Sequence, residues 1–208
     1  PSVDPPLMVE QQQAVDELLR ALRGKGGRFL LNGVTGSGKT EVYIHAIRQV
    51  LKSGRTAIVL VPEIALTPQM VDWFRARFGE AKVVVGARSA VFAPNANLGM
   101  IIVDEEHEQT YLSEHRPRYD AREVAQKRCE DSGAVLLLGS ATPSIASYMR
   151  TMPGVRPENR LTLLRMSERV LGRPMPQVDV VDMRSELSKG NKSMFSGELM
   201  EAMHECLA

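Results

Sequence analysis

The chain has 208 residues, of which 43% are hydrophobic, and this length and apolar content suit one globular domain or one domain with part of a second. Its 26 Lys and Arg residues nearly balance its 25 Asp and Glu residues. This balance neither indicates nor excludes a nucleic-acid partner, and any basic surface must be local. We interpret Cys129 and Cys206, which lack metal-like spacing, as reduced thiols of a cytosolic protein. The sequence contains no apolar stretch long enough to span a bilayer and no signal peptide, so we expect no membrane partner.

The apolar pattern predicts helices that alternate with strands along the first 140 residues. Such alternation favours an α/β fold with a doubly wound, mostly parallel sheet. Continuous apolar runs such as residues 57–61 are typical of strands buried on both faces. In chain order we expect a helix over 7–23, a strand over 29–31, a helix over 41–52, a strand over 57–61, a helix over 68–78, strands over 82–85 and 98–103, a helix over 121–131 and a strand over 134–138.

A glycine-rich segment lies between the first predicted strand and the second predicted helix, and it fits the pattern G-x-x-x-x-G-K-[ST]. In that context its backbone N–H groups and the new helix N-terminus are expected to bind phosphates. We expect Lys39 to reach the β- and γ-phosphates and Thr40 to ligate Mg²⁺. The predicted ATP-binding residues are Gly33, Val34, Thr35, Gly36, Ser37, Gly38, Lys39 and Thr40.

An acidic pair, Asp104 and Glu105, follows the strand predicted over 98–103. Magnesium prefers hard oxygen ligands, so we expect Asp104 to hold Mg²⁺ beside the phosphates. Glu105 is expected to polarise the attacking water, which makes Lys39, Asp104 and Glu105 the candidate catalytic residues. The alternative is a solvated acidic strand end, which the upstream phosphate loop disfavours.

Three predicted site segments follow strand ends: the phosphate loop, the acidic pair and the triplet Ser140, Ala141 and Thr142. The carboxyl ends of parallel strands meet at one edge of a sheet, so we expect these segments to face one cleft. From spacing alone, ordinary capping of a helix that starts near Ser144 is the favoured explanation of the triplet.

Beyond residue 150 the composition changes, with four prolines between 151 and 176. We expect residues 1–150 to form the ATP-binding lobe, 151–176 a connecting segment, and 177–208 the beginning of an incomplete second lobe. Residues 161–164 could add an edge strand, 178–181 are predicted to be a strand, and 196–208 a helix. The chain starts without Met and ends inside a helical pattern, so we expect a piece of a larger protein.

Several runs together resemble the bacterial primosomal protein N′ family, the replication-restart helicases of superfamily 2. The resemblance covers essentially the whole chain, and its motifs occur in the family's order. The runs that carry it are Gly33–Tyr43, Val61–Gln69, Gly86–Ala90, Asp104–His107 and Gly139–Ser144.

This resemblance implies a RecA-like lobe of a 3′-to-5′ ATP-dependent DNA helicase that acts at stalled forks in primosome assembly and replication restart. It implies forked and single-stranded DNA, primosome proteins and single-stranded DNA-binding protein as partners, and a cytoplasmic, nucleoid-associated location in bacteria. It also implies an adenine-side role for Gln11, for which a plain exposed helix residue is the alternative. Coupling of hydrolysis to movement would fall to His107, Ser140, Ala141 and Thr142.

The resemblance further implies DNA contacts from the segments 62–69 and 86–89, and from an aromatic-rich loop over residues 108–122. In that loop, tyrosines can stack on bases while arginines, Arg122 included, meet phosphates; the alternative is a polar surface loop with one Tyr packed beneath it. The candidate DNA-binding residues are Pro62, Glu63, Thr67, Gln69, Arg88, Ser89, Tyr111, Arg116, Arg118 and Tyr119.

The sequence departs from the family pattern in three respects. The segment between Phe78 and Lys82 is too short for the strand and helix that relatives carry there, and Ala87 replaces a common Thr. The family's zinc-binding insertion and the second-lobe arginine finger have no counterpart here, so we expect zinc only in the full-length protein and poor hydrolysis by this chain alone. Two alternatives stay open: a non-catalytic, nucleotide-dependent fork-binding scaffold, and another superfamily 2 translocase of the RecG type.

Overall fold

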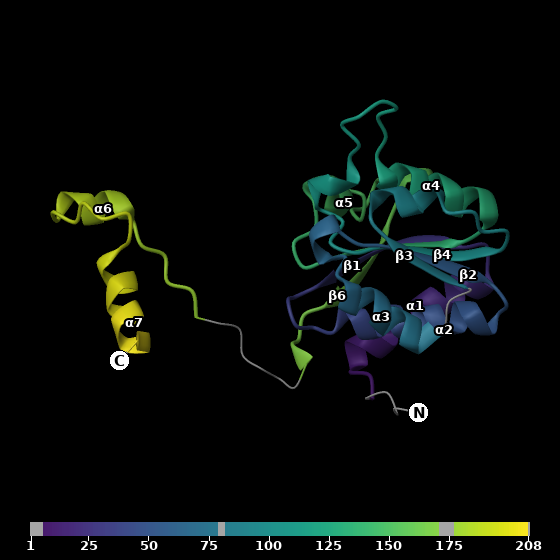
Figure 1. Cartoon of the computed structure of the whole chain (residues 1–208), viewed down its shortest axis with the longest axis horizontal. Helices are drawn as coiled ribbons and strands as arrows, with labels where there is room; N and C mark the ends of the chain where they lie inside the picture. Colours follow the sequence, from purple (N-terminus) through teal and green to yellow (C-terminus); the bar gives the residue numbers. More distant parts are fainter. Residues whose placement is uncertain (1–5, 79–81, 171–176, 208) are drawn as a thin grey trace. The chain divides into compact units, whose positions relative to one another are not determined.

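A computed structural model describes residues 6–78, 82–170 and 177–207. The chain divides into two compact units, residues 1–173 and 174–208. The first unit is an α/β domain built on a six-stranded parallel sheet (Figure 1). This confirms the predicted fold class.

The strand order is β3-β2-β4-β5-β1-β6, so β1 lies between two strands that come much later in the chain. The six strands are β1 (Gly27–Gly33), β2 (Thr56–Leu60), β3 (Val83–Gly86), β4 (Leu98–Val103), β5 (Val135–Ser140) and β6 (Thr162–Met166). The edge strand expected over 161–164 is β6, which pairs with β1 in parallel register, for example Leu30 with Leu163.

Helices cover both faces of the sheet (Figure 1). The helices α1 (Val9–Arg23), α2 (Lys39–Lys52) and α3 (Pro68–Phe78) lie on one face, and α4 (Ala121–Ser132) and α5 (Ile145–Met149) on the other. Alternate residues of each central strand point to opposite faces, which divides the core in two. In β4, Met100 and Ile102 pack under α1 and α2, whereas Ile101 and Val103 pack under α4.

Short 3₁₀ turns connect several strands to their helices, and they carry many of the predicted site residues. They are η1 (Glu63–Ala65), η2 (Arg88–Phe92), η3 (Gln109–Tyr111) and η4 (Pro157–Asn159). Among the described residues, no helix is both long enough and apolar enough to cross a bilayer.

The second unit contains α6 (Met183–Ser188) and α7 (Gly197–Leu207). Helix α7 was expected, but the strand predicted over 178–181 is wrong, because these residues have no regular structure. A strand needs a hydrogen-bonding neighbour, and no described segment pairs with this one. Helix α6 was not foreseen; the Asp182 carboxylate caps it by accepting from Arg184 N at 2.9 Å. The shortened segment after Phe78 and part of the expected connector, residues 79–81 and 171–176, lie outside the described residues.

Candidate nucleotide and DNA site

The glycine-rich loop joins the end of β1 to the start of α2, as its sequence predicts. Gly36 and Gly38 have φ angles of +81° and +78°, a region in which a Cβ is strained. A Cβ at Gly33 would lie 2.6 Å from Ser37 Oγ, so the loop also requires a glycine there for close approach. In the first turn of α2, Glu41 N donates to the Gly38 carbonyl at 3.0 Å, which leaves the N–H groups of Lys39 and Thr40 to face an anion.

Lys39 opens α2 and lies between the loop and the acidic strand end. Its Nζ donates to the Gly33 carbonyl at 3.1 Å and lies 3.9 Å from Glu105 Oε1. The ammonium group therefore sits between the place expected for phosphates and the carboxylate expected to orient water. Glu105 itself has a φ of +44°, an uncommon value for a residue with a Cβ.

Asp104 lies at the end of β4, and the buried Tyr43 of α2 donates its hydroxyl hydrogen to Asp104 Oδ1 at 2.8 Å. Burial raises the pKa of the Asp104 carboxyl, and the Tyr43 hydrogen bond partly opposes this shift. Burial, together with the Asp104 charge, raises the pKa of Tyr43 well above its ordinary value. A half-buried carboxylate of this kind is suited to a cation that would offset the cost of its charge.

Thr40 is exposed at the first turn of α2, next in sequence to Lys39. A hydroxyl, one carboxylate and phosphate oxygens form a donor set that Mg²⁺ accepts without a dedicated cage of side chains. Consistent with this, the described residues hold no group of three or more His, Cys, Asp or Glu side chains arranged to bind a metal.

His107 and Ser140 are brought together across the ends of β4 and β5. His107 Nδ1 lies 2.8 Å from Ser140 Oγ and 3.6 Å from Glu105 Oε2. Ser140 Oγ also accepts from the backbone N–H of Thr142 at 3.0 Å. Hydrogen bonds therefore join three of the four predicted coupling residues, with Ala141 as the intervening link of the backbone, and His107 also lies beside Glu105.

Glu106 was given no role from the sequence, yet its side chain is completely buried. Its carboxylate accepts from Ser144 N at 2.7 Å, Ser144 Oγ at 3.1 Å and Ser147 Oγ at 2.7 Å. It thereby fastens the acidic strand end to the start of α5. Glu106 follows two other acidic residues, and nothing in such a run indicates that one of its side chains is buried.

Tyr43 was also not singled out, although its spacing offers a signal. It lies four residues after Lys39 and therefore on the same face of α2. A Cβ at Gly139 of β5 would lie 1.9 Å from the Tyr43 hydroxyl oxygen, so this glycine makes room for the hydroxyl beside Asp104.

Gln11 is buried beneath the phosphate loop, so its alternative reading as an exposed helix residue is wrong. Its Nε2 donates to the Ser37 carbonyl at 2.9 Å, and its Oε1 accepts from Met8 N at 2.8 Å. The side chain thus ties the start of α1 to the loop.

Tyr111, expected to stack on DNA bases, is instead fully buried. Its hydroxyl donates to the Leu60 carbonyl at 3.2 Å and the Asp104 carbonyl at 2.5 Å. The apolar ring packs beneath α4, and the hydroxyl finds backbone partners there, which favours burial over exposure. Pro62 is likewise buried and cannot contact DNA directly, whereas Glu63, Thr67, Gln69 and Ser89 are exposed.

The rest of the aromatic-rich loop forms a short hairpin that rises from the body before α4 (Figure 1). Leu112 and Asp120 pair as an antiparallel bridge, and Ser113 N donates to the Tyr119 carbonyl at 2.8 Å. Arg116 and Arg118 at its tip are exposed. The hairpin therefore presents two guanidinium groups to solvent.

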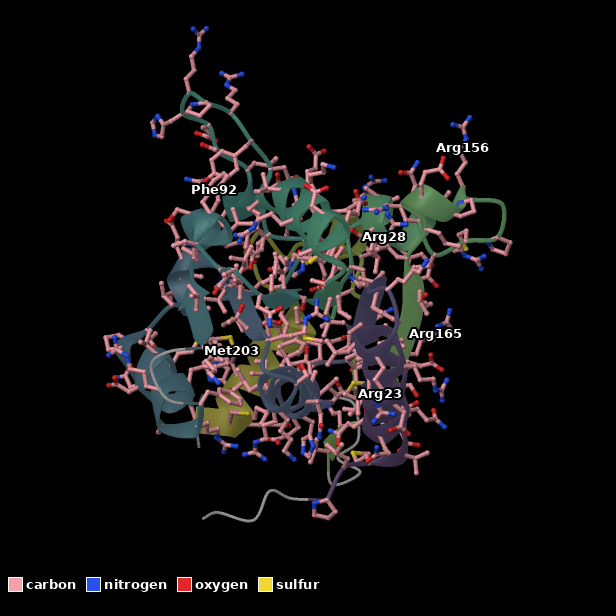
Figure 2. The ribbon with its side chains drawn as sticks, turned by 90° about the vertical axis from the view of Figure 1, so that its right-hand side faces the viewer. Arg23, Arg28, Phe92, Arg156, Arg165 and Met203 are labelled. Atoms are coloured by element: carbon pink, nitrogen blue, oxygen red, sulfur yellow. The ribbon has the colours of Figure 1, made fainter. Side chains whose placement is uncertain are left out.

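Tyr119 and Arg88 lie at the base of this hairpin rather than at its tip. The Tyr119 ring packs edge-on against Phe92, with centroids 4.9 Å apart, and Phe92 is itself 56% exposed (Figure 2). Arg88 donates to the Thr110 carbonyl at 3.1 Å and to the Leu112 carbonyl at 2.5 Å. Two segments expected to contact DNA are thus joined to each other.

Arg122, expected to meet DNA phosphates, is engaged within the chain. Its guanidinium pairs with Asp120 at 2.7 Å and donates to the Glu106 carbonyl at 2.7 Å. The Asp120 hydrogen bond raises the pKa of Arg122. Arg122 therefore holds the hairpin base against the acidic strand end.

A parallel sheet with a phosphate loop after β1 and an acidic pair after β4 defines the first unit as a P-loop NTPase domain of the helicase type. The family described as "Type III restriction enzyme, res subunit" matches residues 5–92. Among solved structures, the Pyrococcus furiosus Hef helicase domain has a TM-score of 0.54 at 16% identity, covering 80% of this chain and 39% of that one, which shows the fold alone.

The chain is homologous over nearly its whole length to a segment of the replication restart proteins PriA, which confirms the family resemblance of its motifs. It is 49% identical to that of Bacillus subtilis over 229 aligned residues and 43% identical to that of a Synechocystis strain, covering 98% of this chain in both comparisons. It spans only 28% and 27% of these relatives' lengths. Since 229 aligned residues exceed the 208 of this chain, the Bacillus relative carries residues without a counterpart here.

Proposed function

We propose that this chain is the ATP-binding lobe of a DNA helicase that acts in replication restart. The observation that carries this proposal is the convergence of Lys39 and Glu105, 3.9 Å apart, beside the half-buried Asp104. Phosphoryl transfer asks the protein chiefly to position and to stabilise charge, and this trio supplies a cation for phosphate, a Mg²⁺ ligand and a carboxylate that orients water.

In this proposal the loop from Gly33 to Thr40 binds the phosphates, and Thr40 and Asp104 bind Mg²⁺. Bound Mg²⁺ would neutralise developing charge on the phosphates. Gln11 is buried against the Ser37 carbonyl, which supports a role at the nucleotide site. In this position its side chain acts on the backbone of the phosphate loop.

The contact from His107 to Ser140 supports a role in coupling. A displacement of Glu105 on hydrolysis would be passed to His107, and from His107 to Ser140. Ser140 would pass it on to the backbone of Thr142. On the DNA side, Arg116 and Arg118 are the candidates for phosphate contacts, because both are exposed at the hairpin tip. Buried Tyr111 then acts from below, through the Asp104 carbonyl.

The proposal extends to the whole protein by homology with the PriA relatives. The full protein would unwind DNA in the 3′-to-5′ direction at stalled forks in the bacterial cytoplasm, together with primosome proteins and single-stranded DNA-binding protein. We expect zinc to belong to a region beyond these 208 residues. We also expect the isolated chain to bind Mg²⁺–nucleotide weakly and to hydrolyse it slowly, because the transition-state arginine belongs to the second lobe.

The test is the change of Lys39 to alanine, with Lys52→Ala at the far end of α2 as the matched control. In the 208-residue chain, Lys39→Ala should abolish binding of a fluorescent Mg²⁺–ADP analogue, and in the full-length protein it should abolish ATP-dependent unwinding. Lys52→Ala should leave both unchanged. If Lys39→Ala retained unwinding and restart in the full-length protein, a non-catalytic scaffold would replace the motor. DNA-stimulated turnover by the isolated chain at the full-length rate would contradict the incomplete-site account.

A further inference from the structure

Every carbonyl oxygen of the phosphate loop from residue 33 to residue 38 accepts a hydrogen bond. Three of the donors belong to the loop and the start of α2, one is the side chain of Gln11, and two come from residues that follow β6. In chain order the donors are Lys39 Nζ at 3.1 Å, Ser37 N at 2.9 Å, Arg169 Nε at 2.9 Å, Val170 N at 2.9 Å, Gln11 Nε2 at 2.9 Å and Glu41 N at 3.0 Å.

The two donors that follow β6 belong to the segment Ser167–Val170, which we call the clasp. The clasp lies against the loop at its most glycine-rich point. Arg169 donates to the Thr35 carbonyl and Val170 N to the Gly36 carbonyl. A Cβ at Gly38 would lie 3.0 Å from Val170 Cγ2, which places the clasp in direct contact with the turn into α2.

The clasp is itself anchored at its other end by Glu10 of α1. One Glu10 carboxylate oxygen accepts from Ser167 N at 2.7 Å and Glu168 N at 3.3 Å, and the other accepts from Ser167 Oγ at 2.6 Å. These hydrogen bonds lower the pKa of Glu10, so its carboxylate is charged when it holds the clasp. Upstream, Val34 N donates to the Met166 carbonyl at 3.0 Å, which continues the β1–β6 pairing into the loop.

The geometry of a planar trans peptide explains what the clasp does for a ligand. The carbonyl of one residue and the N–H of the next point in opposite directions. Fixing the Thr35 carbonyl toward Arg169 therefore aims the Gly36 N–H to the other side, where an anion would lie. Glycine permits many backbone conformations, so the peptide groups on either side of Gly36 rotate easily. Without hydrogen bonds from another segment they would be the least constrained part of the loop.

We propose that the clasp belongs to the nucleotide site, and that Arg169 and Glu10 are positioning residues that keep the loop N–H groups directed at the β-phosphate of a nucleoside di- or triphosphate. This inference rests on the proposed nucleotide-binding function. In this proposal Arg169 acts on the loop through its hydrogen bond to the Thr35 carbonyl.

The experiment compares Arg169→Ala with Arg165→Ala in the full 208-residue chain. Arg165 is an exposed arginine four residues away, and its guanidinium donates to Tyr148 Oη. Binding of a fluorescent Mg²⁺–ADP analogue, followed by anisotropy, should weaken by at least about tenfold in Arg169→Ala, as expected for the loss of one hydrogen bond from a charged donor. Arg165→Ala should bind as the wild type does. Inorganic pyrophosphate should lose affinity by the same factor as the analogue, because only the phosphate end is affected.

Glu10→Ala provides an independent variant, with Glu17→Ala on the same helix as its control. It should weaken binding in the same way, since it releases the clasp without touching the loop. The unliganded melting temperature of Arg169→Ala should stay within about two degrees of the wild type, while the rise produced by Mg²⁺–ADP shrinks.

The outcomes separate two failures. If the wild-type chain binds neither probe, the proposed nucleotide function is overturned and this inference falls with it. If the wild-type chain and Arg169→Ala bind both probes equally well, only the clasp is overturned. If unliganded Arg169→Ala melts well below the wild type, the residue has a general structural role and the positioning assignment is wrong.

Discussion

The close fit between Gly139 and Tyr43 gives a quantitative test of how the site is assembled. An added Cβ at position 139 would lie 1.9 Å from the Tyr43 hydroxyl oxygen and 3.0 Å from Cζ. Tyr43 is 2% exposed and packs among the buried core residues of one face of the sheet. Gly139→Ala must therefore displace the ring and break the hydrogen bond to Asp104.

The expected cost combines two effects. Overpacking a core costs about 1–3 kcal/mol, and a lost hydrogen bond to a charged group about 1.5–3 kcal/mol. With partial relaxation we expect Gly139→Ala to lower the free energy of unfolding by about 3 kcal/mol. Tyr43→Phe alone should cost about 1.5 kcal/mol, because it removes only the hydrogen bond.

The double variant isolates the clash, because Tyr43→Phe deletes the oxygen that the new methyl group would meet. In the Tyr43→Phe background, Gly139→Ala should cost only about 1 kcal/mol, which leaves a coupling of about 2 kcal/mol between the two positions. Urea denaturation of the four proteins measures this coupling. Equal costs of Gly139→Ala in both backgrounds, within about 0.5 kcal/mol, would refute the reasoning.

Two further predictions concern the metal ligand and the hairpin. Burial raises the pKa of Asp104, so folding disfavours its charged form. Asp104→Asn should therefore raise the melting temperature at pH 7 by about 2–4 °C. The same change should abolish Mg²⁺-dependent nucleotide binding. This stability gain should shrink as the pH falls toward the raised pKa, because wild-type Asp104 then becomes neutral. Scanning fluorimetry from about pH 5 to about pH 8 measures the difference in melting temperature between the two proteins. A lower melting temperature for Asp104→Asn at every pH would contradict the assignment. For the hairpin, Arg116→Ala combined with Arg118→Ala should reduce the salt dependence of single-stranded DNA binding by about 1.4 in log–log slope, without changing the melting temperature. The control is Arg156→Ala combined with Arg160→Ala, at exposed arginines outside the hairpin (Figure 2 labels Arg156); an equal loss of slope there would indicate nonspecific charge.

The sheet was predictable because its signals are local. A buried parallel strand such as residues 56–60 is a continuous apolar run, and the phosphate loop has a fixed residue pattern with a conformational reason for each glycine. The shared edge of the site followed from the geometry of parallel strands, which brings Lys39 and Glu105 together without any knowledge of side chains.

The inward-facing polar residues were not predictable, since their positions depend on partners distant in sequence. Tyr111 is 51 residues from Leu60, which it bonds, and Glu106 is 38 residues from Ser144. An aromatic ring or an acidic run has the same sequence whether it turns outward or inward. The prediction of a strand over 178–181 failed for a related reason. An apolar run indicates a tendency to form a strand, but a strand also needs a neighbouring strand to pair with.

The position of β1 in the sheet has a consequence for the order in which the protein is made. Its two neighbours are β5 and β6, the last strands of the first unit, so β1 has no sheet partner until residue 135 and beyond has been synthesised. At about 5–20 residues per second, the ribosome needs roughly 5–20 s to add the hundred residues after the phosphate loop. During that interval the loop lacks the donors Arg169 and Val170, which later hold two of its carbonyls. We therefore expect nucleotide to play no part in the early stages of folding, and the loop to bind it only when the first unit is nearly complete.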